Sequence, residues 1–228
     1  MNKTLLFLLS ICLLTPALAD ERDRAIIASS ADDRVQLELL SRVGYGFHIV
    51  KTDAFKRKVS GEFFFNVLQL DAFPIPNLGL SLGVDCAFNR ISANGAEFYL
   101  DAARKIQALN LSNADMPYGA KLTGGFKNFS LITPLMVRGI FGDLKVSLGA
   151  EVHANLTGTA YYNYYVNNKT TRVSESKARV NRFSGAVVGS VTYCDMGFFV
   201  KYYPTFAPLL PAGSVPMSYW TIGLIYGM

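Results

Sequence analysis

Residues 131–159 read LITPLMVRGIFGDLKVSLGAEVHANLTGT, and the alternation in this stretch decides the fold. Apolar and polar side chains take turns from residue 144 to residue 156. Successive side chains of an extended chain point to opposite faces, so a period of two predicts a strand. Gly142 and Asp143 supply a tight turn between two long arms. Globular strands usually run about 5–6 residues, whereas about 9–11 tilted residues cross a bilayer. The length of this hairpin therefore favours a membrane-spanning sheet.

Similar alternation recurs along the chain. We predict strands at residues 35–50, 61–72, 78–89, 120–141, 144–159, 182–193, 198–206 and 218–228. The connections alternate between long and short, and the long ones include a polar loop at 161–181 and a short helix at Ala96–Leu109. Outer-membrane barrels combine an even number of strands with long external loops and short periplasmic turns. The sequence therefore predicts an all-β fold, an eight-stranded antiparallel up-and-down transmembrane β-barrel, in one domain at residues 35–228.

The first 34 residues have the features of an export segment. Lys3 precedes an apolar run at residues 5–14, and Ala17-Leu18-Ala19 supplies small residues for cleavage. This order predicts a signal peptide at residues 1–19. Residues 20–34 are charged and patternless, which indicates a periplasmic lead-in. No later apolar run reaches the length of about 18 residues that a transmembrane helix needs. We expect an exported protein in the outer membrane of a bacterium.

Composition and charge limit the classes of partner. Half of the residues are hydrophobic and 13% are aromatic. The formal net charge is +5, of which Lys3 contributes one within the leader. So small an excess does not indicate nucleic-acid binding, but it fits loops that face anionic lipid head groups. We expect a monomer whose partners are outer-membrane lipid and lipopolysaccharide; the sequence identifies no protein partner.

Three segments carry a resemblance to a known family. They are LITPL at 131–135, LGA at 148–150 and IGLIYGM at 222–228. With these segments in place, residues 35–228 resemble the small outer-membrane β-barrel proteins of Bacteroidetes known as the PorT-like family. The resemblance implies an outer-membrane barrel and raises a part in protein secretion as one candidate role.

The polar faces of the predicted strands contain charges that would point into the barrel. The set is Glu38, Arg42, Glu62, Asp85, Arg138, Lys145, Glu151 and Lys201. An eight-stranded barrel is only wide enough for side chains to fill it, and buried charges must be paired to be tolerated. We predict a plug of charged pairs and a structural or interaction role. The alternative is a narrow porin-like channel, with these charges lining a gated path for ions.

Two histidines suggest a second alternative, a lipid-modifying enzyme. His153 lies two residues from Glu151 on one face, and Ser147 and Thr157 share that face. Nucleophilic catalysis needs a nucleophile beside a base that a third group orients. Alternation alone produces such neighbours, and no nucleophile signature stands beside them. We expect no enzymatic activity.

No cofactor is expected, and no Cys or His pair has the spacing of a metal site. Cys86, in mid-strand, and Cys194, in a turn, are expected to be free thiols.

Two basic loops form the remaining candidate site. The residues are Lys56, Arg57, Lys58, Tyr162, Tyr165, Lys169 and Arg172. Positive charge there either neutralises neighbouring lipopolysaccharide phosphates or captures a ligand. Tyr161, Tyr162, Tyr164 and Tyr165 serve in the second case as an aromatic platform. We favour the first interpretation, in which the tyrosines belong to the aromatic girdle at the membrane interface.

Overall fold

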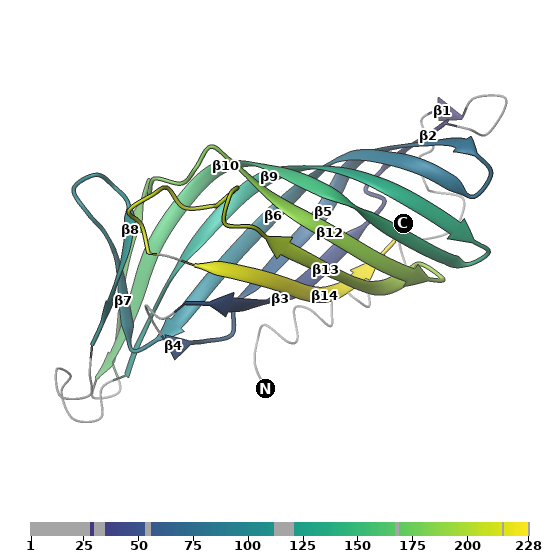
Figure 1. Ribbon diagram of the computed structural model, residues 1–228. Helices are drawn as coiled ribbons and strands as arrows, with labels where there is room; N and C mark the ends of the chain where they lie inside the picture. Colours follow the sequence, from purple (N-terminus) through teal and green to yellow (C-terminus); the bar gives the residue numbers. More distant parts are fainter. Residues whose placement is uncertain are drawn as a thin grey trace.

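The computed structural model describes residues 28–29, 35–52, 56–111, 121–166, 169–215 and 217–227. Eight antiparallel strands formed by these residues close into a barrel, and the strands run at a tilt to its long axis (Figure 1). In ring order they are β3 (Val43–Lys51), β5 (Gly61–Ile75), β6 (Leu78–Asn94), β9 (Lys121–Phe141), β10 (Leu144–Val166), β12 (Phe183–Tyr193), β13 (Met196–Tyr203) and β14 (Ser218–Tyr226). The ring closes where β14 pairs with β3. The predicted eight-stranded antiparallel barrel is confirmed.

The two ends of the barrel differ in their connections. At the short-turn end, tight turns join β5 to β6, β9 to β10 and β12 to β13. Gly142 forms one of these turns with a positive φ of 63°, a conformation that costs glycine little. At the long-loop end, β3, β6, β10 and β13 finish and longer segments follow. No helix among the described residues is long and apolar enough to cross a membrane.

Large apolar side chains cover the outside of all eight strands. Examples, in ring order, are Phe47, Leu70, Leu82, Leu135, Leu148, Val187, Phe198 and Leu224. The residues between them point inward and are buried, as the pattern of β9 from Ser130 to Arg138 illustrates. Monomeric soluble proteins rarely expose apolar patches beyond a few hundred Å². We call this outer surface the apolar belt.

β-Bulges in β5 and β10 shift which residues point inward. In β5 the pairing with β6 slips between Asn66 and Leu68, so that Gln69 and Asp71 are buried beyond the slip. One extra residue exchanges the two faces of a strand. In β10 a similar slip lies between Asn155 and Thr157. Thr157 is consequently exposed, and its predicted place on the His153 face is wrong.

The first predicted strand is two strands. β2 (Val35–Leu39) pairs with the short-turn part of β5, and β3 pairs with the other part. Between them Leu40 has a φ of 51°, a conformation rare for residues other than glycine. A two-residue strand, β1 (Ala28–Ser29), pairs with β2. The signal peptide and most of the lead-in lie outside the described residues.

The long-loop end contains more strand than the sequence predicted. The predicted helix at Ala96–Leu109 is wrong, because β7 (Ala96–Leu100) and β8 (Ile106–Asn110) form a hairpin there. Asp101 fixes its turn by accepting hydrogen bonds from the backbone N–H groups of Ala103 and Lys105, both at 2.9 Å.

The predicted loop at 161–181 is also wrong in large part. β10 continues to Val166 and pairs with β11 (Lys169–Ser176). Two strands further around the ring, β13 ends at Tyr203, before Pro204, since proline cannot donate to the ladder. A two-residue strand, β4 (Lys56–Arg57), pairs with the end of β6. The sheet therefore extends past the apolar belt on the β6–β9–β10 side.

Candidate functional site

The centre of the barrel holds one lysine between two carboxylates. Lys201 of β13 donates to Glu62 of β5 at 2.6 Å, and its Nζ lies 3.0 Å from Glu151 of β10. All three side chains are buried. Tyr203 donates its hydroxyl to the second oxygen of Glu62, and His153 Nε2 lies 3.3 Å from Glu151 Oε2. The arrangement joins strands that are not neighbours in the ring, so it braces the barrel across its interior.

Two further ion pairs lie nearer the short-turn end. Arg42 contacts Asp85 at 2.7 Å, and Asn66 donates to the other oxygen of Asp85, also at 2.7 Å. Arg138 contacts Asp71 at 2.6 Å, and Gln69 donates to both Asp71 oxygens. Charge-assisted hydrogen bonds of this length are about twice as strong as neutral ones. Each buried charge here has a partner, which is what makes its burial tolerable.

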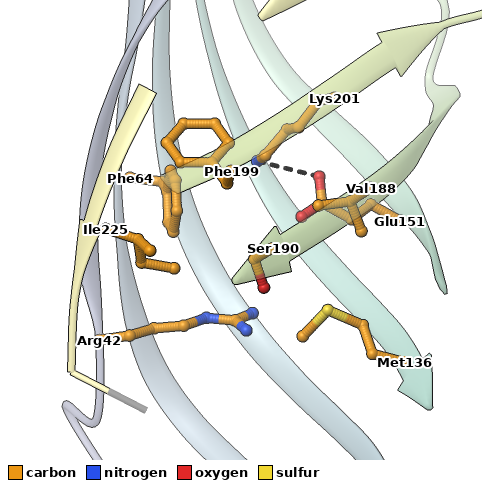
Figure 2. Close-up of a pocket in the computed structure, with 9 residues that line it drawn as sticks. All are labelled: Arg42, Phe64, Met136, Glu151, Val188, Ser190, Phe199, Lys201 and Ile225. Carbon is orange, nitrogen blue, oxygen red and sulfur yellow. Dashed lines mark ion pairs between the residues drawn. The ribbon is translucent and has the colours of Figure 1, made fainter. Parts of the chain in front are cut away.

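An apolar layer separates the central lysine from these pairs. It comprises Phe64, Ala87, Ile132, Met136, Val188, Phe199 and Ile225. The Lys201 ammonium also lies 4.3 Å from the centre of the Phe64 ring, a cation–π contact. Figure 2 shows the small cavity that remains between Arg42 on one side and Lys201 with Glu151 on the other. Its volume is about 10 Å³, room for one water molecule at most.

The interior changes character again at the long-loop end. Phe98 and Ile106 of the β7–β8 hairpin pack with Leu209, Leu210 and Val215 of the segment after β13. These side chains meet inward-facing apolar residues of the barrel wall, namely Val50, Ile91, Ala93, Phe126, Ala160, Ala186, Tyr203 and Tyr219. We call this cluster the apolar cap.

Backbone hydrogen bonds connect the parts of the apolar cap. Val215 donates its N–H to the Ile106 carbonyl at 2.9 Å, and the Asn181 N–H donates to the Leu209 carbonyl at the same distance. The Asn181 side chain donates to the carbonyls of Pro208 and Leu210. Three connecting segments thus converge on the mouth of the barrel. In the sequence, residues 207–215 are short apolar runs between prolines, and no pattern indicates that they contact the other two segments.

The eight charges predicted to point inward fall into two groups. Six are buried in the barrel: Arg42, Glu62, Asp85, Arg138, Glu151 and Lys201. The other two lie toward the rim. Glu38 is half-buried in β2, and Lys145 lies 3.3 Å from Asp195 with its side chain 20% exposed. Strict alternation along β5 does not place Asp71 inside the barrel, but the bulge turns it inward.

The two histidines occupy different settings. His48 Nδ1 lies 2.8 Å from the Thr221 hydroxyl, and its ring packs edge-on against Tyr219. His153 contacts Glu151 and packs edge-on against Tyr203. Ser147, the other hydroxyl on the His153 face, is buried with no hydrogen-bond partner among the described residues.

The predicted loop residues are spread over the extended sheet, from β4 to β11. Lys56 pairs with the end of β6, and Lys58 donates to Thr123 of β9 at 3.2 Å, whereas Lys169 and Arg172 lie on β11. The Arg57 side chain lies outside what the structure describes. Tyr162 is half-buried and Tyr165 is 37% exposed on β10. Tyr161 differs from the other tyrosines, since it is buried and hydrogen-bonded to Arg90 and Ser92.

Cysteines and metals add no site among the residues described. Cys86 is half-buried on the outer side of β6, Cys194 is exposed in the β12–β13 turn, and both are free thiols. Within the same residues, no group of three or more His, Cys, Asp or Glu side chains is arranged to hold a metal ion.

No protein-family model and no curated protein matches the chain. Among solved structures, it is similar to Ail, the attachment invasion locus protein of Yersinia pestis, in complex with the heparin analogue sucrose octasulfate. The identity is 15%, the alignment covers 85% of this chain and 97% of Ail, and the TM-score is 0.37. The neisserial surface protein NspA is similar at 10% identity, with the same coverages and a TM-score of 0.35. Similarity this distant does not identify the fold or the role of the chain. The barrel is established by the strand pairing of the chain itself. The PorT-like resemblance stays a prediction.

Proposed function

We propose that the chain is a bacterial outer-membrane protein whose apolar belt lies in lipid. The outward residues of β6 are apolar from Leu78 to Phe88, apart from the half-buried Cys86 thiol, and Arg90 follows them. That length matches the about 9–11 tilted residues that cross a bilayer. Leu135, Leu148 and Leu224 are each more than half exposed. A leucine side chain gains about 1.5–3 kcal/mol on leaving water, so a belt of such residues favours lipid strongly. In this orientation the short turns face the periplasm.

We further propose that the interior is sealed and that the role is structural or one of interaction. The observation that supports this most is the lysine bridge, in which Lys201 joins Glu62 and Glu151 across the middle of the barrel. To cross the barrel, an ion would have to separate Lys201 from the two carboxylates and also pass through the apolar cap. Both obstacles are formed by the chain itself, so no additional domain is needed to close the barrel. The narrow porin-like channel is the alternative that this proposal disfavours.

Planar-bilayer recording tests the sealed interior. The purified full chain, reconstituted at neutral pH, is expected to give no stepwise conductance, because separating buried ion pairs costs several kcal/mol. A variant in which the bridge is neutralised (Glu62→Gln with Glu151→Gln and Lys201→Met) is expected to remain silent as well, since the apolar cap is intact. Reproducible unitary steps from the wild-type protein would establish the channel instead.

We also propose that the protein is not an enzyme. We propose further that it interacts with other molecules through the part of the sheet that extends past the apolar belt. His153 and Glu151 lie beneath the apolar cap, away from any lipid substrate. Lipid A mass spectra from cells with the wild-type gene and with His153→Ala are expected to be identical. A changed acylation pattern that depends on His153 would overturn this. Membership of the PorT-like family and a part in secretion remain proposals, which capture of a secretion component by the wild-type barrel would support.

A further inference from the structure

Two basic side chains lie over one buried tyrosine on the outside of the barrel, and a third stands on the same face of the sheet. The tyrosine is Tyr161 of β10, and the bases are Arg90 of β6, Lys127 of β9 and Arg172 of β11. The Arg90 guanidinium lies 5.3 Å and the Lys127 ammonium 5.6 Å from the centre of the Tyr161 ring. Arg172 pairs with Asn163, two residues along β10 from Tyr161 on the same face. We call these four residues the Tyr161 cluster.

Tyr161 is buried and hydrogen-bonded, and it fixes the position of Arg90. It is 2% exposed, and its hydroxyl lies 2.7 Å from the Ser92 hydroxyl and accepts a hydrogen bond from Arg90 Nε at 2.9 Å. The ring can lie across β9 because the residue opposite is Gly125. A Cβ there would stand 2.9 Å from the Tyr161 hydroxyl. The tyrosine therefore acts as a platform, and Arg90 is fixed through Nε while its two terminal nitrogens have no hydrogen-bond partner among the described residues.

The cluster concentrates like charge. Arg90 and Lys127 are direct cross-strand neighbours, and partial burial together with the charges of Arg172 and Arg90 lowers the pKa of the Lys127 ammonium. Like charges placed directly opposite on a sheet are destabilising. Within the described part of the chain no carboxylate forms an ion pair with any of the three bases. Such a group is better explained by an anion that binds there than by the stability of the barrel alone.

The height of the cluster indicates which anion. On β6 the outward residue before Arg90 is Phe88, and on β9 the outward residue next to Lys127 is Phe129. Phe88 and Phe129 belong to the apolar belt, and their rings pack together with centroids 4.8 Å apart. The bases thus stand immediately above the last apolar residues, on the long-loop side. A lipid whose acyl chains lie along Phe88 and Phe129 would place its head group among them.

We propose that the Tyr161 cluster binds the phosphate of a phosphorylated glycolipid of the outer leaflet, the lipid A part of lipopolysaccharide. The proposal rests on the outer-membrane placement argued above, and it adds a defined site on one side of the barrel. Arginine suits this role because its planar guanidinium matches phosphate oxygens in pairs, while lysine contributes a point charge. Lys58, which donates to Thr123 further along β9, borders the same face and extends it.

Native mass spectrometry of the full-length protein with lipid A tests the site. The probes are bisphosphorylated lipid A and the same lipid with its phosphates removed. The variant Arg90→Gln with Lys127→Gln and Arg172→Gln is compared with a control that loses equal charge elsewhere, Lys51→Gln with Lys177→Gln and Arg179→Gln. Since a base near a membrane surface contributes about a fivefold factor in binding, the cluster variant should bind bisphosphorylated lipid A about 100-fold more weakly. The control should change by less than about threefold, because the distant charges are screened.

Two further arms make the outcome specific. Tyr161→Phe keeps the ring but removes the hydroxyl that holds Arg90, and should weaken binding about fivefold, the effect of one hydrogen bond. Inorganic phosphate in large excess should leave lipid A bound, because it lacks the acyl chains that contact the belt. Equal losses in the cluster variant and the control, or full displacement by inorganic phosphate, would overturn the proposal.

Flotation with liposomes separates this failure from failure of the proposed function. If the wild-type protein floats with the liposomes but its lipid A binding ignores the cluster, only the site is wrong. If it does not float, the membrane placement itself is wrong.

Discussion

The belt region and the long-loop end of this barrel have opposite polarity. In the belt region, leucines and phenylalanines face outward, while Lys201, Glu62 and Glu151 are buried inside. At the long-loop end the apolar side chains are inside, in the apolar cap, and the outer face presents the bases of the Tyr161 cluster. The same sheet is therefore apolar on its outer face in the belt region and apolar on its inner face at the long-loop end. The change occurs within one outward step, from Phe88 to Arg90 on β6.

The medium around each region, rather than the strand structure, therefore determines which face of the sheet is apolar. Lipid outside requires the polar groups of the wall to turn inward, where only ion pairs can satisfy them. Water outside allows the opposite order, an apolar interior with a charged surface. With the proposed membrane placement, the apolar cap is a small soluble-type core built on the rim of the barrel.

The largest expected effect comes from breaking the interior of the belt region. Lys201→Met leaves Glu62 and Glu151 buried without their cation, and should lower the free energy of unfolding by about 3–5 kcal/mol. Urea denaturation of the protein in lipid vesicles measures this. The matched control is Lys145→Met at the short-turn rim, where the ion pair is partly exposed and its loss should cost about 0–1 kcal/mol.

A companion variant sharpens that result. Adding Glu62→Gln and Glu151→Gln to Lys201→Met removes the stranded charges, so most of the lost stability should return. If Lys201→Met alone costs no more than Lys145→Met, the buried bridge does not brace the barrel.

A smaller effect is expected in the apolar cap. Ile106→Val removes one methyl group from a fully buried position and should destabilise the cap by about 0.5–1.5 kcal/mol. Hydrogen exchange of the Val215 amide reports this directly, because that N–H donates to the Ile106 carbonyl. Exchange there should quicken by roughly threefold to tenfold, while amides of β12 in the belt stay unchanged. Uniform quickening along the whole barrel would mean that cap and barrel unfold as one unit.

The sequence predicted the ring of strands well, because apolar side chains outside and charged side chains inside impose strict alternation. It failed where that alternation shifts. Val67 and Leu68 are adjacent apolar residues, and both are exposed because of the bulge in β5. That pair was the available sign that Asp71 would turn inward. A bulge is set by pairing with β6, however, and single-strand periodicity does not contain that information.

The long-loop end was harder to predict for another reason. In Ala96–Leu109 the apolar residues fit a helical spacing as well as two short strands, and only contact with β9 and β10 favours the hairpin. Leu209 and Leu210 lie in a connecting segment, where the sequence does not indicate burial. They are buried because the β7–β8 hairpin brings Ile106 against them. The Tyr161 cluster likewise joins residues of four strands, spread along the sequence from Arg90 to Arg172. Sites assembled by long-range pairing leave no local pattern.

The depth at which outward side chains of β6 lie in a bilayer shows whether the apolar belt is in lipid. Spin labels would be placed on Leu82→Cys and Asn94→Cys, in a background with Cys86 and Cys194 replaced by serine, and the protein reconstituted in liposomes. Both positions face outward and are exposed on the same strand, but Leu82 lies in the apolar belt and Asn94 beyond it. Collisions with dissolved oxygen should dominate at position 82, and collisions with a water-soluble nickel chelate should dominate at position 94. Equal access of the nickel chelate to both labels would contradict a barrel that spans a membrane.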